Sequence, residues 1–265
     1  MPDCRTNCGP MSEAVIDTTE DLFLGGRLRL RQPKSGHRAG HDAMLLAAAT
    51  AAAAGDRVVE FGAGVGAAGL ALARRAGAIA LTLVEIDPSL ASLARDNAAA
   101  NGIAADVVVL DVTASGQSFA SHGLQPDSAD AVLMNPPFND AARHRGSPDQ
   151  ARASAHVADS ETLDRWIHAG RRLLKSGGVL TMIWRADALA EVLAALGRGF
   201  GSLAVQPMHA DAGRPAIRIL IRAVKGGRAP TRILAGLMLN DESGLPNKQV
   251  AEILAGGGVL PLATP

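Results

Sequence analysis

The tetrapeptide Asn135-Pro136-Pro137-Phe138 brings together groups that could hold a flat amino group. The Asn135 amide and the Pro136 carbonyl can each accept a hydrogen bond, while the Phe138 ring offers an aromatic face for stacking. Few binding tasks need this combination, and the transfer of a methyl group to a planar nitrogen is one of them. We therefore predict that Asn135, Pro136 and Phe138 are catalytic and that Pro137 contacts the substrate.

The tetrapeptide follows an apolar run, residues 131–134, which is typical of a buried strand. Because proline has no backbone N–H, two consecutive prolines end the hydrogen-bonded ladder and turn the chain outward. Open α/β sheets bind their ligands at the carboxyl ends of their strands. We therefore expect Asn135 to lie at such an edge.

A glycine-rich loop, Glu60-Phe61-Gly62-Ala63-Gly64-Val65-Gly66, lies between a predicted strand and a predicted helix. Glycines let backbone N–H groups approach a ligand closely, and the start of a helix adds positive potential. Gly64, Gly66 and Gly69 also satisfy the dinucleotide pattern G-x-G-x-x-G. The loop alone therefore leaves a nicotinamide dinucleotide open as the ligand.

Three acids at the ends of successive predicted strands favour S-adenosylmethionine over a dinucleotide. Glu60 would oppose a pyrophosphate but suits a ligand that carries a cationic amine and a sulfonium. Glu85 stands where an acid can bind ribose hydroxyls, with Asp87 as the alternative. Asp111 could accept a hydrogen bond from the exocyclic amine of adenine.

Apolar strands alternate with helical segments from residue 57 onward, which predicts a parallel, doubly wound α/β sheet. The expected strands are 57–60, 80–85, 107–110, 129–134, 179–184, 203–208 and 217–224. The expected helices are 42–54, with Asp42 as its N-cap, 67–76, 88–100, 162–174 and 187–196. The loop 210–215 is too short for a parallel crossover, so the last strand should be antiparallel to its neighbour.

Composition and patterning divide the chain into four expected parts. Residues 57–225 form the predicted core. A disordered leader (1–20) precedes a hairpin and helix that cap the cofactor site (21–56), and a basic tail with a short helix follows (226–265).

The bulk numbers predict a soluble protein of the cytoplasm. Hydrophobic residues make up 48% and the formal net charge is zero, which argues against a protein that coats nucleic acid indiscriminately. No stretch approaches the roughly 18 apolar residues of a membrane span. Cys4 and Cys8 have no further metal ligands nearby, so we predict reduced thiols and no metal. We expect a monomer or homodimer without membrane contact.

Residues 36–225 resemble the class I, Rossmann-like methyltransferases that use S-adenosylmethionine. The Asn-Pro-Pro-aromatic motif is similar to the catalytic motif of enzymes that methylate planar nitrogens. Within the class, the chain most resembles the bacterial valine-tRNA (adenine-N6) methyltransferase family, through Gly40-His41-Asp42-Ala43-Met44-Leu45-Leu46 and the basic segment Lys225-Gly226-Gly227-Arg228-Ala229-Pro230. That family usually has Tyr at the fourth motif position, where this chain has Phe138. Guanine-N2 methyltransferases of ribosomal RNA can also carry Asn-Pro-Pro-Phe, so the target base stays open.

The resemblance implies a mostly parallel seven-stranded sheet with an antiparallel last strand and helices on both faces. It implies that the loop glycines line the methionine end of the cofactor, which Asp42, Arg38 and His41 close over. The cofactor-binding residues implied by the resemblance and by the strand-end acids are Asp42, Glu60, Gly62, Ala63, Gly64, Gly66, Glu85, Ile86, Asp111, Val112 and Asn135.

Basic residues gather in two stretches, 27–38 and 214–232, that could contact phosphates or simply be solvated. We predict further substrate contacts from Arg143 and Arg145, just past the motif, and from Arg228 in the tail. The expected partner is therefore RNA, with tRNA favoured.

Two other functions remain open from the sequence. A glutamine amide is also a planar amine, so N5-methylation of a protein fits the same motif. A catalytically silent scaffold that binds the cofactor or RNA is the third possibility, and the intact acids and Asn135 argue against it.

Overall fold

The computed structural model describes residues 17–36, 38–137 and 148–264, and the side chains of all of these except 148–159. Its strands are β1 (Thr18–Phe23), β2 (Leu28–Pro33), β3 (Arg57–Phe61), β4 (Ala80–Glu85), β5 (Ala105–Val109), β6 (Ala129–Met134), β7 (Leu174–Arg185), β8 (Phe200–His209), β9 (Ala216–Lys225), β10 (Arg232–Ile233) and β11 (Leu237–Met238). Its α-helices are α1 (His41–Ala49), α2 (Ala67–Ala76), α3 (Pro88–Ala100), α4 (Gly116–Ser121), α5 (Pro148–Leu173), α6 (Leu189–Leu196) and α7 (Lys248–Leu254). Short 3-10 turns are η1 (Leu24–Gly26), η3 (Ala186–Ala188) and η4 (Pro261–Ala263).

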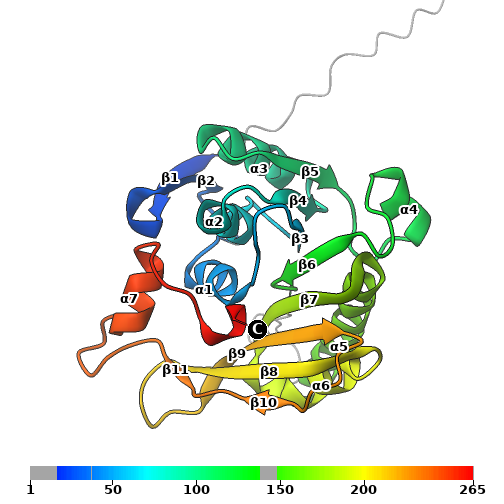
Figure 1. Ribbon diagram of the computed structural model, residues 1–265. Coiled ribbons are helices and arrows are strands. Elements are labelled where there is room, and N and C mark those ends of the chain that lie inside the picture. Colours follow the sequence, from blue (N-terminus) through cyan, green and yellow to red (C-terminus); the bar gives the residue numbers. More distant parts are fainter. Residues whose placement is uncertain (1–16, 37, 138–147, 265) are drawn as a thin grey trace, which may run out of the picture.

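The central sheet has the strand order β10-β8-β9-β7-β6-β3-β4-β5, and β11 also pairs with β8 (Figure 1). Strands β3 to β7 pair in parallel, whereas β9 runs antiparallel to both β7 and β8. The predicted seven core strands and the antiparallel last strand are therefore confirmed. The two-residue strands β10 and β11 lengthen one edge and were not predicted, since runs this short carry no periodicity.

Both faces of the sheet are covered, which explains why the strands read as continuous apolar runs. On one face, residues such as Val58 and Leu83 pack with α1, α2 and parts of α3 and α7. On the other face, residues such as Val59 and Phe61 pack with α4, α5 and α6. The result is a three-layer molecule (Figure 1).

The two ends of the described chain join the same core cluster. Strands β1 and β2 form the predicted antiparallel hairpin, and Leu28 and Leu30 of β2, which packs on α2 and α3, are fully buried. From the other end, Leu260 donates its backbone N–H to the carbonyl of Ala48, and Leu262 is buried in the same core cluster. None of the helices in the described residues is long and apolar enough to cross a membrane.

Three helices differ from the predictions. Helix α1 starts at His41 with Gly40 as N-cap, so the expected capping role of Asp42 is wrong, and it ends at Ala49, before the predicted residue 54. Helix α5 begins at Pro148, upstream of the predicted 162. The short helix α4, capped by Ser115, was missed because six residues are too few to show a 3.6-residue repeat.

Candidate active site

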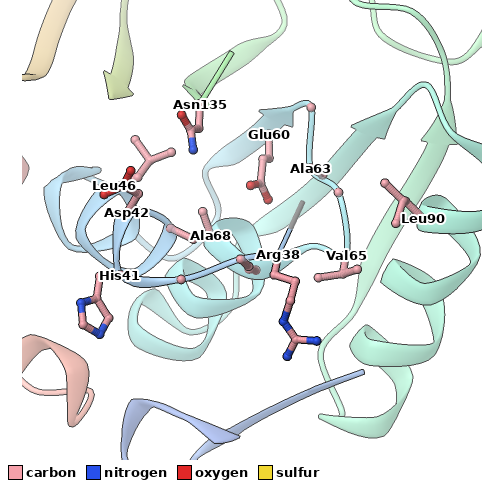
Figure 2. Close-up of a pocket in the computed structure, with 16 residues that line it drawn as sticks. Arg38, His41, Asp42, Leu46, Glu60, Ala63, Val65, Ala68, Leu90 and Asn135 are labelled. Atoms are coloured by element: carbon pink, nitrogen blue, oxygen red, sulfur yellow. The ribbon is translucent and has the colours of Figure 1, made fainter. Parts of the chain in front are cut away.

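A cavity of about 370 Å³ lies at the carboxyl ends of β3 and β6, between the glycine loop and the start of α1 (Figure 2). This volume falls in the range of small-molecule sites. Two of the predicted strand-end residues, Glu60 and Asn135, meet in it. The lining residues are Arg38, Ala39, Gly40, His41, Asp42, Ala43, Leu46, Glu60, Gly62, Ala63, Gly64, Val65, Ala67, Ala68, Leu90 and Asn135.

The glycine loop is tightly packed from behind at two of its glycines. Gly62 has a φ of +63°, and a Cβ there would lie 2.5 Å from Cη2 of Trp166. Gly66 has a φ of +85°, and its Cβ would lie 2.9 Å from a methyl group of Leu83. Only glycine meets both demands, a left-handed backbone and no side chain, so the loop can pass between the sheet and the cavity.

Glu60 is the acid at the floor of the cavity, and it is only 5% exposed. Its Oε2 accepts a hydrogen bond of 2.7 Å from the backbone N–H of Gly69 in α2. Burial, with the nearby Glu85 carboxylate adding to it, raises the pKa of Glu60 to about 8. A buried acid in a cavity lined by backbone amides fits a ligand that brings its own positive charge, as the ammonium and sulfonium of S-adenosylmethionine do.

Glu85, at the end of β4, supports the loop from the side and is 6% exposed. Its Oε2 accepts from the N–H of Gly64 at 2.7 Å, and its Oε1 accepts from the N–H of Asp87 at 2.9 Å. Each oxygen keeps a lone pair for a ribose hydroxyl. Asp87 instead caps α3, because its Oδ1 accepts from the N–H groups of Ser89 and Leu90.

The residues expected at the adenine end lie outside the cavity, on the rim formed by β4 and β5. Ile86 is 61% exposed, while Val112 is buried. Asp111 is exposed, and its Oδ1 accepts from both the N–H and the hydroxyl of Thr113. The structure therefore brings the residues expected at the methionine end together in a cavity, whereas Ile86 and Asp111, expected at the adenine end, are exposed outside it.

Asn135 follows β6 directly, as predicted. Met134 pairs with Phe61 of β3, so the next residue on each strand, Asn135 and Gly62, stand at the same edge. Figure 2 shows the Asn135 side chain above the cavity, on the side of Leu46 and Glu60. Pro136 is buried and Pro137 is exposed. Phe138, Arg143 and Arg145 lie outside the described residues.

Arg228 lies far from this site. It follows β9, whose carboxyl end stands at the amino edge of the parallel strands, and the neighbouring Ala229 donates to Oγ of Ser202 there. A ten-residue strand spans about 30 Å, so a base held at Asn135 is out of reach of Arg228. The predicted substrate contact of Arg228 therefore concerns a part of a large substrate that lies away from the target base.

The cavity wall at residues 38–40 is held by the hairpin. Arg38 donates to Oγ1 of Thr19 and pairs with Asp21, and the N–H of Ala39 donates to Oε1 of Gln32 at 2.8 Å. Gln32 was not among the predicted site residues. In the sequence, Gln32 is a polar residue at an inward-facing position of β2, in line with Leu28 and Leu30. The residue is 1% exposed, which marks its side chain as a structural hydrogen-bonding group.

Asp42 contributes from α1, where its Oδ2 meets Nε of Arg218 in β9 at 3.4 Å. Asp42 thus lines the cavity, and its ion pair connects α1 to β9. Among the described residues no group of three or more His, Cys, Asp and Glu could hold a metal ion.

Residues 38–210 match the family model of the methyltransferase small domain. A tRNA1(Val) (adenine(37)-N6)-methyltransferase from Bacteroides thetaiotaomicron is 28% identical over 83% of this chain and 84% of its own. One from Porphyromonas gingivalis W83 is 30% identical over 65% of this chain and 68% of its own. Among solved structures, a predicted O-methyltransferase from Agrobacterium tumefaciens is 31% identical, with a TM-score of 0.69 over 83% of this chain and 98% of its own.

The family match covers more than half of the chain, including α1, the glycine loop and Asn135. The predicted fold class, enzyme class and cofactor are thereby confirmed. The chain belongs to the methyltransferase small domain family and is an S-adenosylmethionine-dependent methyltransferase.

Proposed function

We propose that the protein methylates the exocyclic N6 amine of adenine in tRNA. The observation that carries this proposal is the position of Asn135, which lines the cavity at the carboxyl end of β6, beside the glycine loop and Glu60. The names of the curated relatives, tRNA1(Val) (adenine(37)-N6)-methyltransferases, support adenine in tRNA as the substrate.

The proposed chemistry needs little from the protein beyond position. S-adenosylmethionine, when bound, supplies a methyl group that is already activated as an electrophile. The side-chain oxygen of Asn135 and the carbonyl of Pro136 accept the two N–H groups of the amine. An aryl amine is a poor nucleophile because its lone pair is delocalised into the ring, and these two bonds favour the pyramidal form in which the lone pair is localised. The stabilisation grows toward the transition state.

The bond changes balance without a strong base. The amine lone pair forms the N–C bond as the methyl–sulfur bond breaks, and the sulfur keeps that electron pair. The methylated amine is cationic and therefore acidic, so it loses its extra proton to solvent.

We also propose the cofactor contacts. Glu60 and Asp42 face the ammonium end in the cavity, and the backbone of Gly62 to Gly66 follows the methionine chain. The remaining lone pairs of Glu85 hold the ribose. Asp111 and Ile86 receive the adenine on the open rim, where Ile86 offers exposed apolar surface.

An amine acceptor fits this site better than a hydroxyl acceptor. A hydroxyl has one hydrogen to donate, so it would leave one of two adjacent acceptors unpaired, at a cost of about 1–3 kcal/mol. This argument matters because the solved relative from Agrobacterium tumefaciens is described as a predicted O-methyltransferase. Guanine N2 in ribosomal RNA and glutamine N5 in protein also present an NH₂ group. The hydrogen-bonding argument therefore does not distinguish them from adenine N6, and an experiment must.

One experiment separates the substrates. Purified protein is incubated with tritiated S-adenosylmethionine and, in parallel, total tRNA, ribosomal RNA and protein from a bacterium that lacks the modification, followed by nucleoside mass spectrometry. We expect label in tRNA as N6-methyladenosine. Label confined to protein, to guanine or to an oxygen would overturn the substrate assignment. A cytoplasmic location and a monomer or homodimer remain proposals, which gel filtration and cell fractionation test.

A further inference from the structure

Asn97 of α3 uses its whole side-chain amide in bonds to two distant segments. The residue is 1% exposed. Its Oδ1 accepts from the N–H of Arg31 at 2.8 Å, and its Nδ2 donates to the carbonyl of Arg31 at 3.1 Å. The second hydrogen of Nδ2 goes to the carbonyl of Val65 in the glycine loop, at 3.0 Å. One side chain therefore joins the hairpin to the loop that lines the cavity.

Asn101, one turn further along, makes the same bridge to the hairpin without reaching the loop. Its Oδ1 accepts from the N–H of Arg29 at 2.9 Å, and its Nδ2 donates to the carbonyl of Arg29 at 2.6 Å. Its other hydrogen returns to the carbonyl of Asn97 in α3, at 2.7 Å. The two amides together pair with the edge of β2 that faces away from β1, where N–H and C=O groups would otherwise need other partners.

The glycine loop needs outside support because glycine leaves its backbone free. Gly62, Gly64 and Gly66 all have positive φ, of 63°, 55° and 85°. A loop of this kind samples many conformations unless it is held, and a ligand that must order it binds more weakly. Three of the described bonds hold it at successive residues: the N–H of Ala63 donates to the carbonyl of Val84, the N–H of Gly64 to Glu85, and Asn97 donates to the carbonyl of Val65.

Strand β2 also holds the opposite wall of the cavity. Arg31 reaches the loop through Asn97, while the next residue, Gln32, accepts from the N–H of Ala39 in the wall formed by residues 38–40. The backbone groups of Arg31 point sideways from the edge of β2, whereas the side chain of Gln32 points to the buried face, so one strand can serve two walls. The hairpin thus sets the spacing between the glycine loop and the start of α1.

We propose that Asn97 is a positioning residue of the cofactor site, which fixes the glycine loop in its binding conformation and registers it against the β1–β2 hairpin. The inference rests on the proposed use of this cavity by the methionine end of S-adenosylmethionine. Asn97 touches neither the cavity nor the acceptor motif, so it acts on cofactor affinity and not on the methyl-transfer step.

The test compares Asn97→Ala with Asn101→Ala, because both remove a bridge to β2 and only the first releases the loop. Binding of S-adenosylhomocysteine is measured by calorimetry on the full chain. We expect Asn97→Ala to weaken binding about tenfold, because the free loop can relax to pair the carbonyl of Val65 whereas the binding conformation leaves it unpaired, and Asn101→Ala to change it less than about twofold. Asn97→Asp should weaken binding further, since an oxygen would then face the carbonyl of Val65.

Kinetics supply a second readout that a general loss of stability would not give. Asn97→Ala should raise the KM for S-adenosylmethionine with kcat unchanged. Equal effects of the Asn97→Ala and Asn101→Ala variants on affinity, or a fall in kcat at unchanged KM, would overturn the proposal. If the wild-type protein does not bind S-adenosylhomocysteine at all, the use of the cavity fails instead, which keeps the two claims separate.

Hydrogen exchange on the wild-type protein covers the case in which Asn97→Ala does not fold. Saturating S-adenosylhomocysteine should slow exchange at the amide of Arg31, which is bonded to Asn97, more than at the amide of Arg29, which is bonded to Asn101. Equal slowing at the two amides, or greater slowing at Arg29, would contradict the proposed link between cofactor binding and the Asn97 bridge.

Discussion

The backbone N–H of Gly69 donates a hydrogen bond of 2.7 Å to Oε2 of Glu60, and a Cβ on Gly69 would lie 2.6 Å from that same oxygen. Gly69 is the third glycine of the pattern G-x-G-x-x-G, which left a dinucleotide open as the ligand. Here that glycine lets α2 approach a buried acid, which in its ionised form would repel a pyrophosphate and attract a cation. The contact between Gly69 and Glu60 therefore explains why the glycine spacing G-x-G-x-x-G is compatible with a cationic cofactor.

Replacing Gly69 tests this relationship. Alanine usually stabilises a helix by up to about 1 kcal/mol relative to glycine, but in Gly69→Ala the new methyl group would collide with Glu60 and Leu83. We expect a net loss of about 1–3 kcal/mol in the free energy of unfolding and weaker binding of S-adenosylhomocysteine, read by thermal melts and calorimetry. Gly170→Ala in α5 is the control, because its nearest neighbour is a leucine methyl at 3.1 Å outside the cavity. Unchanged affinity in Gly69→Ala would show that the Glu60 contact is not needed.

Cofactor binding should release a proton from Glu60. Its pKa of about 8 means that the carboxyl is mostly protonated at pH 7 in the free protein, and a bound cation favours the ionised form. Affinity should therefore rise between pH 6 and pH 7.5, by at most about tenfold per pH unit. Calorimetry at pH 7 in two buffers of different ionisation enthalpy measures the released proton. Glu60→Gln should show no release, and proton release equal to that of the wild type would assign it to another group.

The same group should affect the stability of the free protein in the opposite direction. At pH values between the ordinary pKa of this side chain, 4.5, and its raised pKa of about 8, the folded state binds more protons at Glu60 than the unfolded state does. The free energy of unfolding contributed by this residue therefore falls as pH rises through that window. Urea unfolding at pH 5.5 and pH 8 should show this loss in the wild type, and Glu60→Gln should show a smaller one.

Substitutions of Glu85 and Asp87 should have different effects, the first on cofactor affinity and the second on stability. Glu85→Ala removes the acceptor for the N–H of Gly64 and the proposed ribose contact, so S-adenosylhomocysteine should bind at least about tenfold more weakly. Asp87→Ala removes the cap of α3 and should cost about 0.5–2 kcal/mol of stability with affinity nearly unchanged. Calorimetry and urea unfolding on both variants measure the split, and the reverse pattern would return the ribose role to Asp87.

The parts of the site that lie close together in the sequence could be predicted from it. Glu60 and the glycines are a few residues apart, and the prolines after Asn135 mark the end of β6 without any tertiary information. The antiparallel β9 followed from the length of one loop, since a parallel crossover needs more residues.

The parts that depend on tertiary contacts could not be predicted. Asn97 meets Arg31 from 66 positions away, and nothing in the sequence of α3 distinguishes a bridging asparagine from a solvated one. Asp42 looked like an N-cap, yet the N-cap is Gly40, two residues earlier, and the carboxylate of Asp42 pairs with Arg218. Arg228 looked close to Arg214 and Arg218 in sequence, whereas β9 carries it to the opposite edge of the sheet.

The measurement that tests the central claim most directly is single-turnover methyl transfer to tRNA by wild-type protein and Asn135→Ala, with the affinity for S-adenosylhomocysteine measured on both. Asn240→Ala is the matched control, because Asn240 does not line the cavity and its Nδ2 donates to Asp211 in the β8–β9 loop. The account predicts N6-methyladenosine from wild type and Asn240→Ala, at least about a hundredfold slower transfer by Asn135→Ala, and similar cofactor affinity in all three. Near wild-type transfer by Asn135→Ala would contradict the acceptor role of Asn135 and with it the proposed mechanism.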